Sequence, residues 1–112
     1  MAKVGYARVS TDDQSLALQL DALKAAGCRR IEREKVSGAS KRRPVLDALL
    51  PTLKRGDVLT VWRLDRLGRS LPHLVQVIAQ LEERGIGFVS VTEAIDTKSA
   101  GGRLVFHLFA AL

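Results

Sequence analysis

A serine and an arginine lie close together near the start of the chain, in the stretch YARVST. Ser10 follows Arg8 by two residues. A serine nucleophile is often activated by a neighbouring histidine. The histidines of this chain, His73 and His107, are far from Ser10 in the sequence. If Ser10 is a nucleophile, a group other than histidine must therefore make its attack feasible.

Arginines in two basic stretches could supply that group. Arg43 ends the run KRR, and Arg66 and Arg69 lie in RLDRLGRS. Guanidinium groups bind the non-bridging oxygens of a phosphodiester in bidentate fashion and stay charged at any working pH. They stabilise the negative charge that develops during attack on phosphorus, and they lower the pKa of a nearby serine. A serine among arginines therefore predicts a phosphate or phosphodiester site.

Each of these residues also has a purely structural interpretation. Ser10 could be a helix cap or a hydroxyl at a strand end, and Arg8 could be an exposed strand residue. Arg66 and Arg69 could lie in a solvated loop with Asp65 as their ion-pair partner. Two glutamines could be plain helix-surface residues, Gln14 and Gln19. Spacing alone supports a basic domain that binds phosphate and leaves its chemistry open.

Length and charge agree with a single basic domain. The chain has 112 residues, with 18 lysines and arginines against 12 acidic residues, for a formal net charge of +6. A polyanionic partner, nucleic acid first, is the natural hypothesis. Cys28 is the one cysteine, so no internal disulfide is expected and a reducing, cytoplasmic setting fits. We find no signal-peptide pattern and no apolar run of membrane-spanning length, and we expect a soluble protein.

Apolar patterns predict strands that alternate with helices. The expected strands are Val4–Val9, a polar edge strand at Arg29–Glu34, Asp57–Trp62 and Ile86–Val91. Four helices are expected. The first follows a capping pattern at Thr11 and Gln14, and the others begin at Pro44, at Pro72 and near Arg103. An irregular stretch is expected at 92–102. This alternation predicts an α/β domain with a mainly parallel central sheet flanked by helices.

The carboxyl ends of parallel strands meet at one sheet edge, where sites of α/β proteins form. Arg8 and Ser10 end the first strand, and Arg66 and Arg69 follow the strand at 57–62. The basic loop SGASKRRP, which we expect to be mobile, could fold over the same edge. We therefore expect one serine surrounded by several guanidinium groups.

The last helix, RLVFHLFAAL, is apolar on nearly every face. Such a helix is either buried or part of an interface. Packing on the domain's own sheet is one possibility, and we favour an oligomer interface because few polar side chains remain. The pattern has no cap at its end, so we expect the chain to be a fragment of a longer protein.

Three motifs resemble the resolvase/invertase family of serine site-specific recombinases. They are GYARVSTDDQ at 5–14, SG at 37–38 followed by RP at 43–44, and LDRLGRS at 64–70. The segment AIDTKSAGGRLVFHLFAAL is also similar to the family's lead into its interface helix. The resemblance covers essentially the whole chain, and the first and third motifs together are specific.

The resemblance implies a catalytic domain of resolvase type at 1–102 and the start of a long oligomerisation helix at 103–112. Ser10 would attack a DNA phosphodiester and form a 5′-phosphoserine link and a free 3′-hydroxyl, which later reseals the DNA. No ATP, metal or other cofactor is implied. The implied partners are double-stranded recombination-site DNA and further copies of the chain, as a dimer and a synaptic tetramer. A bacterial, nucleoid-associated location is implied, with no membrane or small-molecule partner.

Residue roles also follow from the resemblance. The arginines implied to bind the scissile phosphate are Arg8, Arg43, Arg66 and Arg69. Asp65 is implied to hold these arginines or handle the leaving-group proton. Supporting roles are implied for Gln14, Gln19 and the loop residue Ser37. The family's helix-turn-helix domain is not in these 112 residues, so weak sequence recognition and little recombination are expected from the chain alone.

Two other functions compete with this hypothesis. The first is a non-catalytic DNA-binding or regulatory module that uses the arginines only as phosphate contacts. The second is a small phosphatase or nucleotide-binding α/β protein. A binding module does not require a serine at position 10, and Cys28 lacks the phosphate loop that a cysteine phosphatase would place beside its thiol.

Overall fold

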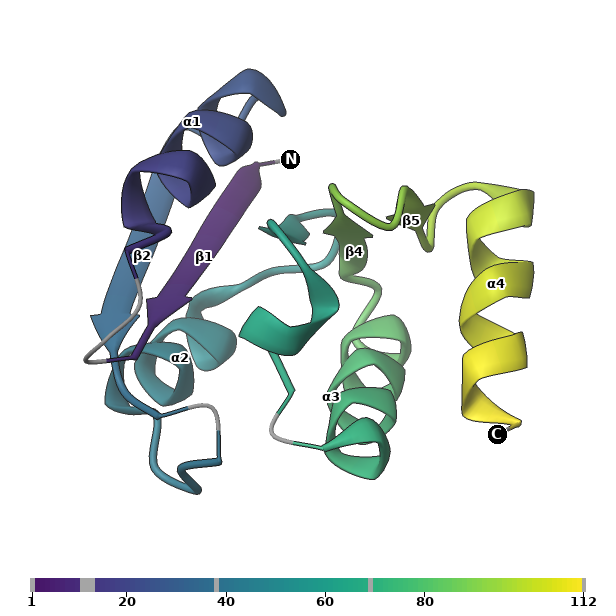
Figure 1. Ribbon diagram of the computed structural model, residues 1–112. Coiled ribbons are helices and arrows are strands. Elements are labelled where there is room, and N and C mark those ends of the chain that lie inside the picture. The colour runs from purple at the N-terminus through teal and green to yellow at the C-terminus, as the bar shows by residue number, and fades with distance from the viewer. Residues whose placement is uncertain (1, 11–13, 38, 69, 112) are drawn as a thin grey trace.

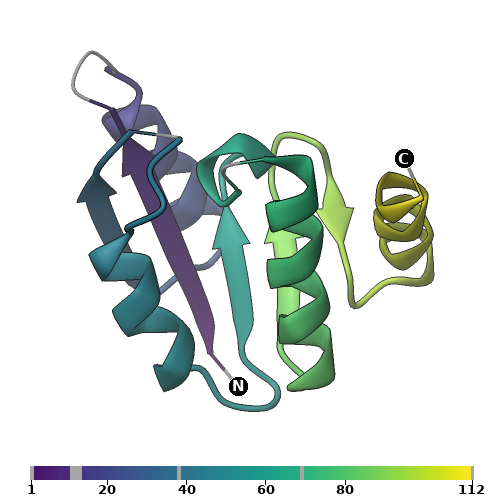
Figure 2. The same cartoon turned by 90° about the horizontal axis from the view of Figure 1, so that it is seen from below.

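A five-stranded sheet organises the chain, in the strand order β2-β1-β3-β4-β5. The computed structural model describes residues 2–10, 14–37, 39–68 and 70–111. The strands are β1 Lys3–Val9, β2 Arg30–Lys35, β3 Val58–Val61, β4 Gly87–Ser90 and β5 Ile95–Asp96. The first four are parallel, and the short β5 pairs antiparallel with β4 (Figure 2). The expected α/β class and mainly parallel sheet are confirmed.

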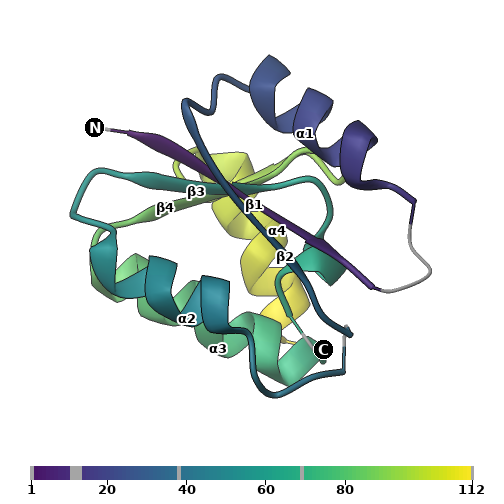
Figure 3. The ribbon, with the colours of Figure 1, turned by 90° about the vertical axis from the view of Figure 1, so that its left-hand side faces the viewer.

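Helices cover both faces of this sheet. They are α1 Leu16–Ala25, α2 Pro44–Leu49, α3 Leu71–Glu83 and α4 Ala100–Ala110, with 3₁₀ turns η1 at Leu50–Thr52 and η2 at Leu64–Arg66. Helix α1 packs on one face, and α2 and α3 pack on the other (Figure 3). Helix α4 lies beyond the β5 edge, beside α3 (Figure 1).

Side chains of β1 point alternately to the two faces of the sheet and pack in two separate hydrophobic cores. Val4 and Tyr6 belong to the larger core with α2 and α3, whereas Ala7 belongs to a smaller cluster with Leu23 and Cys28 under α1. Cys28 is buried, as expected for a small packing residue, and burial raises the pKa of its thiol. This alternation fixes which face of the sheet receives each later side chain of β1.

Local signals explain where α3 begins and ends. The Ser70 hydroxyl accepts a hydrogen bond from the main-chain nitrogen of His73 at 3.3 Å, and Pro72 lies in the first turn. Gly85 follows the helix with φ 73°, a left-handed conformation that suits glycine. The strand β4 therefore starts directly after a tight turn.

The structure corrects three expected boundaries. Helix α1 begins at Leu16, later than the expected cap, because Ser15 precedes it and accepts the first helical bond from Gln19; Thr11 lies outside the described residues. Strand β5 interrupts the stretch expected to be irregular. Helix α4 begins at Ala100 instead of near Arg103, because the Ser99 hydroxyl accepts from Gly102 nitrogen at 2.9 Å.

Helix α4 buries only part of its apolar surface. Phe106 is buried against α3 and the sheet edge, whereas Leu104 and Leu108 are 61% and 60% exposed and Val105 is also exposed. The helix is therefore neither fully buried nor fully covered within this chain. In the described part of the chain, no helix has the length and hydropathy needed to cross a membrane.

Candidate active site

The 3₁₀ turn η2, which follows β3 after two residues, binds Arg8, the residue before the last one of β1. The Arg8 guanidinium donates through Nη2 to the Asp65 main-chain oxygen at 2.7 Å and through Nε to the Arg66 main-chain oxygen at 3.3 Å. Its Nη1 donates to the Val36 oxygen at 3.2 Å, just after β2. Arg8 is only 5% exposed. One guanidinium therefore ties together the ends of three neighbouring strands.

A second arginine reaches the same turn from the start of α2. Arg43 occupies the N-cap position of that helix and is 3% exposed. Its Nη1 donates to the main-chain oxygen of Leu67. The neighbouring Arg42 is exposed. The sequence alone placed Arg43 in a mobile loop, whereas the structure anchors its guanidinium on the turn.

A third guanidinium, that of Arg66, comes from the turn itself. Its Nη1 donates to the main-chain oxygen of Arg8 at 3.2 Å, and its Nε lies 3.3 Å from Asp65 Oδ1. The Trp62 ring lies beneath it, with the guanidinium carbon 5.4 Å from the ring centroid; Arg63 stacks on the same ring at 4.1 Å. Asp65 thus contacts the arginines through both its side chain and its main chain.

These three guanidinium groups lie close enough to repel one another. Burial lowers the pKa of Arg8, and the charges of Arg43 and Arg66 lower it further. The three acceptors that Arg8 contacts are main-chain carbonyl oxygens, which carry no formal charge. A bound phosphate would offset this repulsion and use the guanidinium forks. The cluster is therefore suited to an anionic group with several oxygens.

Ser10 lies at the same edge of the sheet as this cluster. It follows β1 directly and is half-buried. Tyr6 and Arg8 face the α2–α3 side of the sheet, and Ser10 is the next position in that alternation. The structure thus places Ser10 at the carboxyl edge of the sheet with Arg8, Arg43 and the η2 turn.

The other expected site residues differ in how they reach the cluster. Gln19 is completely buried: its Oε1 accepts from Arg8 nitrogen at 3.2 Å, and its Nε2 donates to Arg8 oxygen at 3.0 Å. Its interpretation as a helix-surface residue is therefore wrong.

Two other expected site residues are exposed. Gln14 precedes α1, and the Ser37 hydroxyl accepts a hydrogen bond from Ala39 nitrogen at 3.3 Å. Arg69 lies outside the described residues.

Sequence reasoning missed a buried acid, Glu34, that binds the start of α2. Glu34 Oε2 accepts from the Tyr6 hydroxyl at 2.5 Å and from Leu46 nitrogen at 3.2 Å, while its Oε1 accepts from Val45 nitrogen at 3.1 Å. The carboxylate thereby satisfies amides at the start of α2, where Arg43 is the N-cap. The available signal was an acid next to the last residue of the polar edge strand β2.

Among the residues with described positions, no group of three or more His, Cys, Asp or Glu side chains gathers in a way that could hold a metal ion. Asp65, an acid of the turn, forms an ion pair with Arg66 instead.

Comparison with known proteins identifies the family of this chain. The family model described as the resolvase N-terminal domain matches residues 3–112. The chain belongs to this family. The resolvase-family relatives include the serine recombinase gin of Escherichia phage Mu, 51% identical over 97% of this chain, and the DNA-invertase hin of Salmonella typhimurium, 51% identical over the whole chain. These matches cover 56% and 59% of the relatives, so this chain spans somewhat more than half of their length.

Solved structures agree with the resolvase-family fold. The N-terminal catalytic domain of TP901-1 integrase is similar with a TM-score of 0.80 and 30% identity, over 97% of this chain and 92% of that one. A resolvase family site-specific recombinase from Streptococcus pneumoniae has a TM-score of 0.74 at 21% identity, over 99% of this chain and 85% of that one, and shows the fold alone. The predicted family and fold are therefore both confirmed.

Proposed function

We propose that this domain is the catalytic part of a serine recombinase that cuts and rejoins double-stranded DNA at specific sites. One observation carries the proposal: the guanidinium groups of Arg8, from β1, and Arg43, from the start of α2, are held on main-chain oxygens of η2 and of Leu67, the residue that follows it. Ser10 directly follows the strand that carries Arg8. Membership of the resolvase family and similarity to proteins named recombinase, invertase and integrase support it.

The first step is a transesterification at phosphorus. Ser10 Oγ attacks the scissile phosphate and forms a P–O bond, while the bond from phosphorus to the 3′-oxygen of the neighbouring nucleotide breaks. The serine proton is lost and the departing 3′-oxygen gains one, so the products are a 5′-phosphoserine link and a free 3′-hydroxyl. After strand exchange the reverse reaction reseals the DNA, and the covalent link conserves the bond energy without ATP.

Electrostatics in the cluster suits this step. Negative charge grows on the non-bridging oxygens as Ser10 attacks, and preorganised donors stabilise it without reorganising. We assign this role to Arg8, Arg43 and Arg66, and by its motif position to Arg69. Asp65 would hold Arg66 in place or take part in proton transfer to the 3′-oxygen. Gln14, Gln19 and Ser37 would have supporting roles, and Gln19 would act by fixing the backbone of Arg8.

Assembly is the second part of the proposal. Cutting both strands of two DNA sites requires four serines, which four copies of the chain would provide as a tetramer formed from dimers. Leu104 and Leu108 on α4 are exposed and apolar, as expected for a surface that a second copy covers. We expect the parent protein to act on bacterial or phage DNA in the cytoplasm, in association with the nucleoid.

The test is the covalent adduct. The intact recombinase that contains this domain is incubated with DNA from the region flanking its gene, stopped with detergent, and examined for protein-linked 5′ ends. Ser10→Ala should abolish the adduct while retaining DNA binding. Thr52→Ala, which removes an exposed hydroxyl at the opposite end of the sheet, should leave it unchanged. An adduct of equal yield in Ser10→Ala would show that another residue is the nucleophile.

A further inference from the structure

A carboxylate on the turn after β4 contacts the arginine-binding turn from the side opposite Arg8. Glu93 Oε2 accepts a hydrogen bond from the main-chain nitrogen of Leu64 at 3.3 Å. Its Oε1 accepts from the hydroxyl of Ser90, a completely buried residue at the end of β4. Glu93 therefore links the end of one strand to the first residue of η2.

The main chain holds Glu93 in this place. Val91 nitrogen donates to Val61 oxygen at 3.0 Å, and Thr92 nitrogen donates to Trp62 oxygen at 2.9 Å. These bonds continue the β3–β4 pairing past the strands. Ala94 then adopts φ 57°, an uncommon conformation for a residue with a side chain. The turn that carries Glu93 is thus tied to the segment that leads into η2.

Leu64 connects Glu93 to the part of the turn that binds the arginines, so a movement of Leu64 would shift that part of the turn. Leu67 nitrogen and Gly68 nitrogen both donate to Leu64 oxygen, at 3.1 and 3.3 Å. The next three residues present the main-chain oxygens that bind Arg8 and Arg43. A tilt of the peptide at Leu64 would therefore move the acceptors on residues 65–67 to which the two guanidinium groups donate, whereas the Val36 oxygen that also binds Arg8 lies outside this segment.

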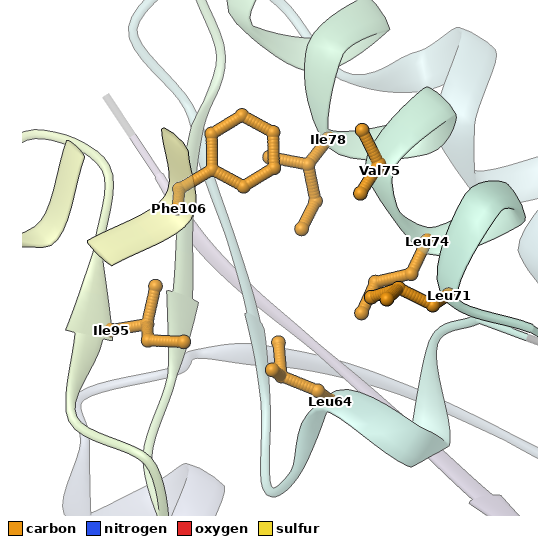
Figure 4. A pocket seen from close by; sticks show the side chains of 7 residues that line it. All are labelled: Leu64, Leu71, Leu74, Val75, Ile78, Ile95 and Phe106. Atoms are coloured by element: carbon orange, nitrogen blue, oxygen red, sulfur yellow. The ribbon is translucent and has the colours of Figure 1, made fainter. Parts of the chain in front are cut away.

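Packing around the Leu64 side chain is wholly apolar. The side chain lines a pocket with Ile95 and Phe106 on one side and α3 on the other (Figure 4). Apolar contacts are not directional, so they do not fix the orientation of the peptide plane. The hydrogen bond from Leu64 nitrogen to Glu93 is directional. The orientation of η2 therefore depends on Glu93 more than on the pocket.

We infer that Glu93 is a positioning residue, which sets the orientation of η2 and thereby the placement of the Arg8 and Arg43 guanidinium groups. The catalytic meaning of this role rests on the proposed function, but the geometric role does not. Because Glu93 is exposed, its truncation removes no core packing. Glu93→Ala should thus loosen the turn without unfolding the domain.

The conservative variant separates this role from loss of charge. In Glu93→Gln, the amide oxygen can accept from Leu64 nitrogen, and the amide nitrogen can donate to the Ser90 oxygen after the hydroxyl rotates. Glu93→Gln should therefore restore what Glu93→Ala loses. Glu83→Ala, which removes an exposed glutamate at the end of α3, is the matched control.

The first measurement uses NMR on this chain without DNA. Loss of one hydrogen bond to a charged acceptor should speed hydrogen exchange of the Leu64 amide by about tenfold in Glu93→Ala. The Arg8 Nε proton should also exchange faster, while the amide of Leu59 in β3 keeps its wild-type rate. Unchanged exchange at Leu64 and Arg8, or an equal rise at Leu59, would overturn the inference.

The second measurement is DNA cleavage by the intact recombinase. Glu93→Ala should lower the cleavage rate by about tenfold or more, Glu93→Gln should restore it, and Glu83→Ala should leave it unchanged. Wild-type cleavage in Glu93→Ala despite a loosened turn would overturn the positioning role. Absence of cleavage in the wild type would count against the proposed function instead, and the exchange data would still decide whether Glu93 orients η2.

Discussion

The side chains of Arg8 and Arg66 each donate a hydrogen bond to the main-chain oxygen of the other residue. Arg8 Nε donates to the Arg66 carbonyl oxygen at 3.3 Å, and Arg66 Nη1 donates to the Arg8 carbonyl oxygen at 3.2 Å. Two side chains of like charge are thereby fixed side by side, and the charge of Arg66 is one of the causes that lower the pKa of Arg8. The backbone hydrogen bonds keep together a pair that electrostatics would separate, so the cluster is preorganised for an anion.

The guanidinium shape of Arg8 should matter beyond its charge. Arg8 donates to three carbonyl oxygens from three different nitrogens of its planar guanidinium group, a spread of donors that the single nitrogen of lysine cannot reproduce. Arg8→Lys should therefore lower the rate of adduct formation by about a hundredfold or more, because a preorganised donor is lost. The measurement is a single-turnover cleavage assay with the intact recombinase.

Arg84 provides the control for that substitution. Its Nη1 and Nη2 donate to the Leu50 and Leu53 oxygens at 2.9 and 2.8 Å, far from η2 in the fold. Arg84→Lys should reduce the free energy of unfolding by about 1 kcal/mol and leave cleavage unchanged. Equal cleavage losses in the two variants would mean that Arg8 acts through stability alone.

Alkaline pH should destabilise the domain through Tyr6. Burial, and then the hydrogen bond to Glu34, raise the pKa of Tyr6 well above its ordinary value of 10.0. Above about pH 10, the unfolded chain loses the tyrosine proton while the folded chain keeps it. The unfolded state then binds fewer protons than the folded state, so the free energy of unfolding falls as pH rises. The free energy of unfolding should fall by about 1.4 kcal/mol per pH unit from this group.

Tyr6→Phe isolates this contribution, because Tyr6 is the one tyrosine of the chain. The variant should be less stable than the wild type at neutral pH by about 1.5–3 kcal/mol, the value of a hydrogen bond to a charged group. Its deficit should shrink above about pH 10. Urea unfolding across this pH range measures both effects, and parallel pH profiles for the two proteins would contradict the assignment.

Two adjacent glycines at the start of α4 should respond in opposite directions. A Cβ atom on Gly102 would lie 1.7 Å from the Asp96 main-chain oxygen, whereas a Cβ on Gly101 would meet nothing within 4 Å. Gly101→Ala should stabilise the helix by about 0.5–1 kcal/mol, because alanine has less conformational freedom to lose. Gly102→Ala should displace α4 from the β5 edge and destabilise the domain by about 1–3 kcal/mol.

Thermal unfolding and hydrogen exchange at the Phe106 amide distinguish the two glycine variants. Exchange at Phe106 should rise in Gly102→Ala and stay at the wild-type level or fall in Gly101→Ala. Equal protection in both variants would show that α4 can be accommodated without the close approach at Asp96.

The sequence predicted the elements better than the contacts between them. The apolar run at 57–62 and the helical spacing of apolar residues in α3 are local patterns, and each produced the expected strand or helix. Gln19 shows where local reasoning fails: its position on α1 gave no sign that it would be buried against the Arg8 backbone. The two-residue strand β5 was missed for the same reason, since only its pairing with β4 makes it a strand.

Residue types and the alternation of strands with helices were enough to predict that a serine and several arginines would gather at the carboxyl edge of a parallel sheet, because strands joined by intervening helices run parallel and their carboxyl ends meet at one edge. Only the tertiary structure decided which main-chain oxygen atoms hold each guanidinium group, and which amides Glu34 and Glu93 bind at the starts of α2 and η2. Those contacts join segments distant in the chain, as between Arg8 and Asp65, so their geometry depends on packing that no local pattern encodes.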